Sequence, residues 1–239
     1  MDRKGQITIW MIFGIVIIAV LAITIFLWGM REFGDKPELN RYEIQLFTER
    51  CLKDTGESAL KKIGLQGTYL HPTDHVETEF GKVGYLSRNG ENVNRTLINI
   101  ERDIAEHVIE NFDICTGNYS VFKQKGLKIK QGDKYLSVGF GEYATIFTLN
   151  YPVSFILANS TFSFERFETE VPIRFKTLFS YALGVKDPDL IDMTYLGDLD
   201  VNTTVLDYNT SKVYVFDDSL SEIRSEERLK SYKLAFAVK

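Results

Sequence analysis

Few residues in this chain have both the types and the spacing that catalysis or metal binding requires. The strongest candidate is His71-Pro72-Thr73-Asp74-His75, where two imidazoles and a carboxylate fall within five residues. Histidine and carboxylate groups bind several divalent ions, but proline and aspartate also form ordinary polar turns. Because no third ligand motif lies near, we predict a turn rather than a metal site. We expect His107 on the solvent face of a helix, beside Glu106 and Glu110.

No catalytic motif is found elsewhere in the sequence. It contains no G-x-S-x-G, H-E-x-x-H or phosphate-loop pattern, and Gly139-Phe140-Gly141 is not followed by a helical pattern, as a dinucleotide fingerprint would be. An acidic run could attract Ca²⁺, but its spacing does not match an EF-hand loop. This run consists of Asp187, Asp189, Asp192, Asp198 and Asp200. We therefore predict a non-enzymatic protein without catalytic residues, cofactor or metal.

The two cysteines, Cys51 and Cys115, belong to no CxxC or metal-ligand spacing. In an oxidising location they could form a disulfide that closes a loop of about 65 residues and contributes about 4 kcal/mol. Two buried free thiols are the alternative. We favour the disulfide on the condition that this part of the chain lies outside the cell.

Asparagine context favours an extracellular location. Five of the eleven asparagines begin N-x-Ser/Thr sequons, where chance would give about one or two. These candidate glycosylation sites are Asn94, Asn118, Asn159, Asn202 and Asn209. Any single sequon can arise by coincidence, but as a group they indicate an exposed and glycosylated surface.

Composition and periodicity indicate a domain with helices and strands. The formal net charge of −5 argues against nucleic acid, which needs a clustered basic surface. Apolar residues recur at helical spacing over about residues 38–63 and 94–112, with Gly64 as a stop for the first helix. From residue 119 the period changes to two, which predicts antiparallel strands.

The strand pattern predicts particular pairings. Residues 127–130 and 135–140 are expected to form a hairpin, and Pro152 to mark a bulge or edge between strands at 144–151 and 153–157. Further strands are predicted at 161–167 and 170–175, then a helical turn at 176–183. Residues 212–216 are expected to pair with residues 232–239 through a charged connection.

The N-terminus carries a long apolar segment. Residues 9–28 include no charged side chain, and twenty residues of helix would extend about 30 Å, the thickness of a bilayer's hydrocarbon core. The segment exceeds the core of a secretory signal, and no small-x-small cleavage site follows it. The predicted fold class is therefore α+β: an N-terminal hydrophobic transmembrane helix, then two amphipathic helices packed on an antiparallel β-sheet.

Arg3-Lys4-Gly5-Gln6, directly before this segment, resembles the class III (prepilin-type) signal peptide of archaeal type IV pilins and archaellins. The resemblance implies cleavage between Gly5 and Gln6 by a prepilin-type peptidase. Trp10 stands where bacterial pilins usually carry a glutamate. A basic flank on an ordinary membrane helix is the alternative.

The resemblance predicts a leader at 1–5, a transmembrane helix at 6–30, a linker at 31–37 and an extracellular domain at 38–239. The order of segments is also similar to that of uncharacterised single-pass archaeal surface proteins. Short sequence motifs such as Glu49-Arg50-Cys51-Leu52 and Asn150-Tyr151-Pro152 carry this resemblance. We expect a pilin-like structural protein of the cell membrane, held in the lipid bilayer and assembled as a homo-oligomer through its N-terminal helix. A monomeric anchored ectodomain that binds a surface partner or ligand is the alternative.

Overall fold

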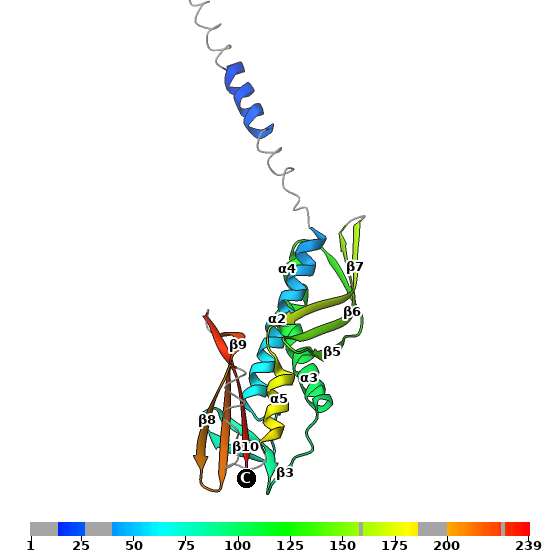
Figure 1. Cartoon of the computed structure of the whole chain (residues 1–239). Helices are drawn as coiled ribbons and strands as arrows, with labels where there is room; N and C mark the ends of the chain where they lie inside the picture. The colour runs from blue at the N-terminus through cyan, green and yellow to red at the C-terminus, as the bar shows by residue number, and fades with distance from the viewer. Residues whose placement is uncertain (1–13, 27–39, 158–159, 186–199, 226–227) are drawn as a thin grey trace, which may run out of the picture. The chain divides into compact units, whose positions relative to one another are not determined.

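The computed structural model describes residues 14–26, 40–157, 160–185, 200–225 and 228–239 (Figure 1). The chain divides into two compact units, Met1–Asn40 and Arg41–Lys239. In the first unit, residues 14–26 form a helix whose aliphatic and aromatic side chains are exposed.

Four α-helices are described in the unit Arg41–Lys239. They are α2 (Arg41–Leu65), α3 (Leu97–Thr116), α4 (Ser120–Gln124) and α5 (Phe175–Gly184), and a 3₁₀ turn, η1 (Gly117–Tyr119), joins α3 to α4. The start of α3 is fixed by a capping box, because Thr96 accepts from the Asn99 amide while the Asn99 side chain accepts from the Thr96 amide. Gly117 ends α3 in the left-handed conformation.

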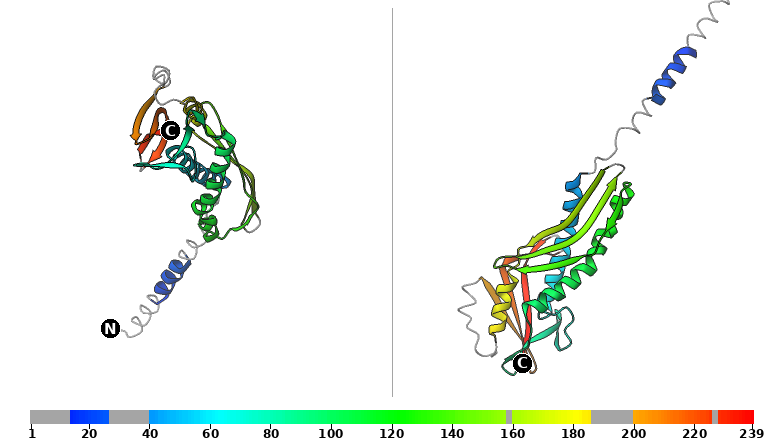
Figure 2. Two further views of the ribbon diagram at one scale, coloured as in Figure 1. Left: turned by 90° about the horizontal axis from the view of Figure 1, so that it is seen from below. Right: turned by 90° about the vertical axis from the view of Figure 1, so that its right-hand side faces the viewer.

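A four-stranded antiparallel sheet is built around one long strand. Its members are β4 (Lys128–Gln131), β5 (Tyr135–Phe140), β6 (Thr145–Leu157) and β7 (Ser160–Val171). Strands β4 and β5 lie end to end along one edge of β6, and β7 pairs with the other edge. Figure 2 shows β6 and β7 as long, bent strands beside α2 and α3.

The second sheet has six strands and joins distant parts of the sequence. Its members are β1 (His75–Thr78), β2 (Gly81–Arg88), β3 (Glu91–Asn92), β8 (Val201–Tyr208), β9 (Ser211–Ser225) and β10 (Arg228–Val238). The order is β1-β2-β10-β9-β8, with β3 on β2. The end of β10 runs parallel to β2, and the other pairs are antiparallel.

Helix α2 packs against both sheets. Near its start, the Arg41 guanidinium lies 5.1 Å from the ring centre of Phe164 on β7. Near its end, the Leu60 carbonyl accepts a hydrogen bond of 2.9 Å from the Tyr232 hydroxyl on β10. Aromatic rings pack beneath its first half, where Tyr119 meets Phe155 edge to face at 5.0 Å. This single helix therefore joins the two sheets.

The predicted fold class is wrong in two respects. Among the described residues no helix is long and apolar enough to cross a membrane; residues 14–26 give about 20 Å of helix, against about 30 Å for the hydrocarbon core. The remainder of the predicted span at 6–30, the leader at 1–5 and the linker at 31–37 lie outside the described residues. In addition, the strands form two sheets, whereas one antiparallel sheet was predicted. One of the two sheets is mixed, because β2 runs parallel to the end of β10.

The predicted hairpin of residues 127–130 and 135–140 is also wrong, because both segments pair with β6. The register of β6 shifts between Asn150 and Val153, as expected of a bulge at Pro152. The Gly132 amide donates to the Pro152 carbonyl at 2.8 Å, so the chain between β4 and β5 follows this bulge. Residues 217–225 and 228–230, expected to be a connection, belong to β9 and β10.

Candidate functional site

A bulge in β9 opens the most distinctive surface site of the unit Arg41–Lys239. Ser231 on β10 lies opposite Glu222, but the next residue, Tyr232, lies opposite Asp218. Residues 219–221 of β9 therefore have no opposing residue in the β10 register. Such bulges bend a strand and redirect its side chains, and they often lie next to functional sites.

A buried charged cluster holds the bulge in place. The Asp218 side chain is fully buried, and it accepts from Arg174 through Nε at 2.8 Å and Nη2 at 2.6 Å. The Ser221 hydroxyl and the Leu220 amide also donate to this carboxylate. The hydrogen bonds that Arg174 donates to Asp218 raise the pKa of the guanidinium. Because two residues of the bulge bind the same buried ion pair, the bulge has a defined shape.

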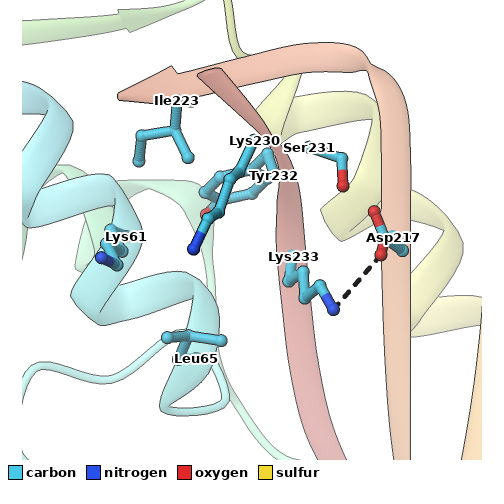
Figure 3. A pocket seen from close by; sticks show the side chains of 8 residues that line it. All are labelled: Lys61, Leu65, Asp217, Ile223, Lys230, Ser231, Tyr232 and Lys233. Carbon is cyan, nitrogen blue, oxygen red and sulfur yellow. Dashed lines mark ion pairs between the residues drawn. The ribbon is translucent and has the colours of Figure 1, made fainter. Parts of the chain in front are cut away.

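A cavity of about 410 Å³ lies between this bulge and the end of α2 (Figure 3). We call it the lysine pocket, because three of the eight described residues that line it are lysines. Its lining comprises Lys61 and Leu65 of α2, Asp217 and Ile223 of β9, and Lys230, Ser231, Tyr232 and Lys233 of β10. In Figure 3, Lys230 extends across the Tyr232 ring toward α2, where Lys61 lies.

Tyr232 contributes a closed, uncharged floor to the lysine pocket. Its side chain is 1% exposed, and its hydroxyl is committed to the Leu60 carbonyl. Burial raises the pKa of this phenol, so it stays neutral. Gly64 allows the close approach of α2 to β10, because a Cβ there would overlap the Tyr232 hydroxyl and the Lys233 carbonyl. Gly64 is therefore a contact point within α2, which continues to Leu65, and the predicted stop was wrong.

The polar groups of the lysine pocket are suited to binding. Lysine ammonium groups only donate hydrogen bonds, and the Lys233 Nζ lies 3.3 Å from Asp217 Oδ2. Among the described residues the lining has three lysines and one aspartate, and Lys61, like Lys233, has an interaction partner.

A second cavity of about 410 Å³, between α2 and β7, is lined by both signs of charge. Its acidic groups include Glu49 and Glu57, and its basic groups include Arg50 and Arg224. Burial raises the pKa of Glu57. With charges of both signs interleaved, this cavity shows no preference for one class of ligand.

The histidine motif forms a turn and a strand start with local ion pairs. Asp74 accepts from Arg88 at 2.9 Å, and His75 lies 3.2 Å from Glu77, while His71 is exposed. No group of three or more potential metal ligands occurs among the described residues. His107 is partly buried on α3, and burial lowers its pKa. Of the acidic run, Asp200 alone falls within the described residues, next to β8.

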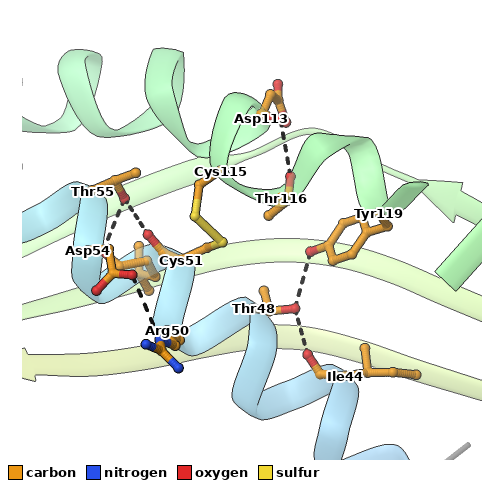
Figure 4. Close-up of a disulfide and its surroundings, with 11 residues drawn as sticks. Ile44, Thr48, Arg50, Cys51, Asp54, Thr55, Asp113, Cys115, Thr116 and Tyr119 are labelled. Atoms are coloured by element: carbon orange, nitrogen blue, oxygen red, sulfur yellow. Dashed lines mark hydrogen bonds and ion pairs between the residues drawn. A yellow bond between two sulfur atoms is a disulfide. The ribbon is translucent and has the colours of Figure 1, made fainter. Parts of the chain in front are cut away.

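The structure joins Cys51 on α2 to Cys115 on α3 as a disulfide, with a Cα–Cα distance of 5.6 Å (Figure 4). Neighbouring threonine hydroxyls donate to carbonyls one turn earlier in α2: that of Thr55 to the Cys51 carbonyl at 2.8 Å, and that of Thr48 to the Ile44 carbonyl at 2.8 Å. The two helices are thus linked covalently beside the sheet formed by β4–β7.

Four of the five sequon asparagines are described, and all four are exposed. Asn94 precedes α3, Asn118 lies in η1, Asn202 lies on the edge strand β8, and Asn209 lies in the β8–β9 turn. Asn159 and the predicted processing residues Gly5 and Gln6 lie outside the described residues.

Sequence reasoning missed the lysine pocket. Its lysines come from the end of α2 and from β10, which lie far apart in the sequence. The local signal in the sequence is the lysine pair Lys230 and Lys233 around Tyr232, and the charge pattern places Lys230 in the predicted connection.

Comparison with known proteins identifies no relative: no protein family model matches the chain, no curated protein matches it, and no solved structure matches it.

Proposed function

We propose that this chain is a non-enzymatic, pilin-like structural protein of the cell surface. A prepilin-type peptidase removes residues 1–5, the apolar segment at residues 9–28 holds the protein at the lipid bilayer, and the unit Arg41–Lys239 lies outside the cell. The observation that carries the proposal is Gly5-Gln6, after a basic pair and directly before an uncharged segment.

The exposed apolar helix supports assembly through the N-terminus. Ile15, Ile18, Ile25 and Phe26 each expose more than 60% of their surface, at 68, 69, 72 and 64%. A helix that is apolar on all sides needs lipid or other apolar helices around it. Before assembly the bilayer supplies that environment, and in a filament other copies of the same segment supply it.

Two features of the larger unit support its extracellular location. Disulfides persist in oxidising compartments, and Cys51 and Cys115 are joined. The four described sequon asparagines are accessible to a glycosylating enzyme. Both features belong to residues that come after the apolar segment in the sequence, and this is the part of the chain that the proposal places outside the cell.

Substitution of Gly5 by phenylalanine tests the processing step. The bulky side chain should block the peptidase, so that the variant keeps its leader and a mass higher by residues 1–5. Asp2→Asn, which leaves Arg3-Lys4-Gly5-Gln6 intact, is the control. A mature mass for Gly5→Phe equal to that of the unsubstituted protein would contradict the proposal.

A second function, a monomeric ectodomain that binds a surface ligand, is favoured by the lysine pocket. Negative-stain microscopy of the cells distinguishes the two functions. Filaments that disappear on deletion of the gene support assembly, whereas cells without filaments that retain the processed protein in their membranes support the monomeric ectodomain.

A further inference from the structure

We propose that residues 120–131 form a basic surface that binds the anionic headgroups of a lipid bilayer. We call these residues the basic segment; they comprise α4, the turn that follows it and β4. The inference deepens the proposed function and rests on its attachment of the chain to a bilayer, because it names the lipid chemistry that the larger unit recognises.

Four exposed lysines concentrate positive charge in the basic segment. They are Lys123, Lys125, Lys128 and Lys130. No aspartate or glutamate occurs in the sequence between Asp113 and Asp133. Within the described part of the chain, none of the four lysines forms an ion pair with a carboxylate. In a chain whose formal net charge is −5, this segment is therefore attractive to an anionic surface.

The fold fixes the backbone that carries these lysines. Phe122 and Leu127 are each 4% exposed and anchor the segment in the core. The Leu127 amide donates to the Phe122 carbonyl at 3.2 Å across the turn at Gly126. Lys128 and Lys130 lie two residues apart on β4, so their side chains share one side of the strand. Because the anchors hold the backbone, the lysines need little reorganisation to meet a charged surface.

The basic segment lies beside the start of α2, where the chain enters the larger unit. Phe122 packs edge to face against Phe47 of α2, with ring centres 5.3 Å apart, and Figure 1 shows α4 beside the first turns of α2. Arg41, the first residue of α2, comes 13 positions after residue 28, the end of the apolar segment. A chain of that length extends at most about 45 Å. The basic segment therefore belongs to the end of the unit that can reach the headgroups around the apolar segment.

A fifth positive charge lies near the four lysines. Lys130, Ser154 and Ser163 are neighbours across β4, β6 and β7, so two strand spacings, or about 10 Å, separate the first from the third. The Ser163 carbonyl accepts a hydrogen bond of 3.5 Å from Arg41, whose guanidinium also lies over the Phe164 ring. Both contacts are uncharged, so they leave the positive charge of Arg41 to add to that of the lysines.

Protection of an open sheet edge explains only part of this pattern. Lysines on an edge strand discourage pairing with other chains, and among the described strands β4 pairs with β6 alone. That role accounts for Lys128 and Lys130, but Lys123 and Lys125 precede β4. Clustered lysines in one short segment are typical of sequences that bind anionic lipid. Val121, which is 50% exposed, adds an apolar side chain beside them.

The test measures how fast N-hydroxysuccinimidyl acetate acetylates each lysine of the full chain, with peptide mass spectrometry as the readout. The chain is placed in nanodiscs of phosphatidylcholine, or of equal parts of phosphatidylcholine and phosphatidylglycerol. We expect the anionic lipid to slow acetylation of the four lysines at least about three-fold, and added NaCl to reverse the effect. Lys82 on β2 and Lys176 on α5, both exposed, are internal controls whose rates should not change.

A matched pair of double variants tests whether the charge of the segment causes the protection. Lys123→Gln/Lys125→Gln should reduce the protection of the two lysines of β4 by about two-fold or more, since each lysine adds to the attraction. Lys82→Gln/Lys176→Gln removes the same total charge elsewhere and should leave that protection unchanged. A thermal melt of each variant confirms folding before labelling.

The outcomes separate this inference from the proposed function. Equal acetylation rates in the two nanodiscs, for a chain that co-elutes with both, would overturn the inference and leave the bilayer attachment intact, as would equal effects of the two double variants. Protection that is the same in both nanodiscs and increases with the number of chains per disc would assign the surface to a second copy and would also overturn it. A chain that co-elutes with neither nanodisc would contradict the attachment and, with it, this inference.

Discussion

Asp218 carries a charge that the interior of the domain must neutralise. It is fully buried, and its carboxylate receives donors from Arg174, Ser221 and Leu220. Removing one partner of such a buried pair leaves the other charge unsatisfied, which costs far more than the net contribution of the pair. The cluster therefore holds the β9 bulge, which lies in the chain between the pocket residues Asp217 and Ile223.

Asp218→Ala should lower the free energy of unfolding by about 3–5 kcal/mol, because it removes the buried carboxylate to which the Arg174 guanidinium donates. The neighbouring Asp217→Asn is the control: its ion pair with Lys233 is partly exposed, and such pairs contribute at most about 1 kcal/mol. Urea denaturation followed by circular dichroism measures both variants. Equal losses in the two would show that the Asp218 cluster has no special role.

The buried Tyr232 makes the free energy of unfolding depend on pH in the alkaline range. Burial raises the pKa of its phenol, and it also raises the pKa of Tyr151 to about 12. A folded pKa above the unfolded value, which is about 10 for tyrosine, gives stability that is complete below about pH 10 and is lost as pH rises toward the folded pKa. The unfolding free energy should therefore fall as the pH rises above about 10, and it should be lower at about pH 11 than at about pH 9.

Tyr232→Phe separates this effect from other alkaline changes. The variant loses the hydrogen bond to the Leu60 carbonyl, at a cost of about 1 kcal/mol at neutral pH. Its further loss between about pH 9 and about pH 11 should be smaller than that of the unsubstituted protein. Denaturant titrations at both pH values provide the measurement, and parallel losses would contradict the assigned role of Tyr232.

At the scale of elements, α2 is the part to which the rest of the larger unit is attached. The disulfide joins it to α3, Arg41 lies against β7, and Leu60 binds Tyr232 on β10. Loss of the Arg41 contact should loosen the sheet that contains β7 from α2, and loss of the Leu60 hydrogen bond should loosen the sheet that contains β10.

Replacing both Cys51 and Cys115 by alanine should lower the unfolding free energy by about 4 kcal/mol, because the link closes a loop with a sequence separation of 64 residues. A reducing agent should destabilise the unsubstituted protein to a similar extent and leave the double variant unaffected. If reduction leaves the unsubstituted protein as stable as before, the link contributes nothing.

Gly64→Ala should destabilise the domain by about 1–3 kcal/mol, since the new methyl group meets the Tyr232 hydroxyl and the Lys233 backbone. The matched control is Gly184→Ala at the end of α5, where a Cβ has no neighbour within 4 Å. Differential scanning fluorimetry should show a lower melting temperature for Gly64→Ala and little change for Gly184→Ala. The reverse order would refute the close packing of α2 on β10.

The sequence identifies elements more reliably than their partners. Helical spacing located α2 and α3, and the change to a period of two located most strands. Periodicity records which face of a strand is buried, not which strand lies beside it, so the pairing of β4 and β5 with β6 could not be read from it. The sequence predicts a helix end at Gly64, whereas in the structure the glycine allows the close contact with Tyr232, which local sequence does not record.

At the scale of the whole chain, the candidate site and the proposed function come from different observations. The lysine pocket depends on a bulge and on contacts between distant segments, which no local motif records. The pilin-like function depends on the order of residues before and within the apolar segment, where local sequence is informative. The two can therefore be tested separately.

The mature N-terminus tests the central claim most directly. The protein is extracted from the membrane fraction of its own cells, and its N-terminal peptide is identified by mass spectrometry. The account predicts a chain that begins at Gln6, with residues 9–28 still present. A chain that begins at Met1 or Asp2 would contradict it.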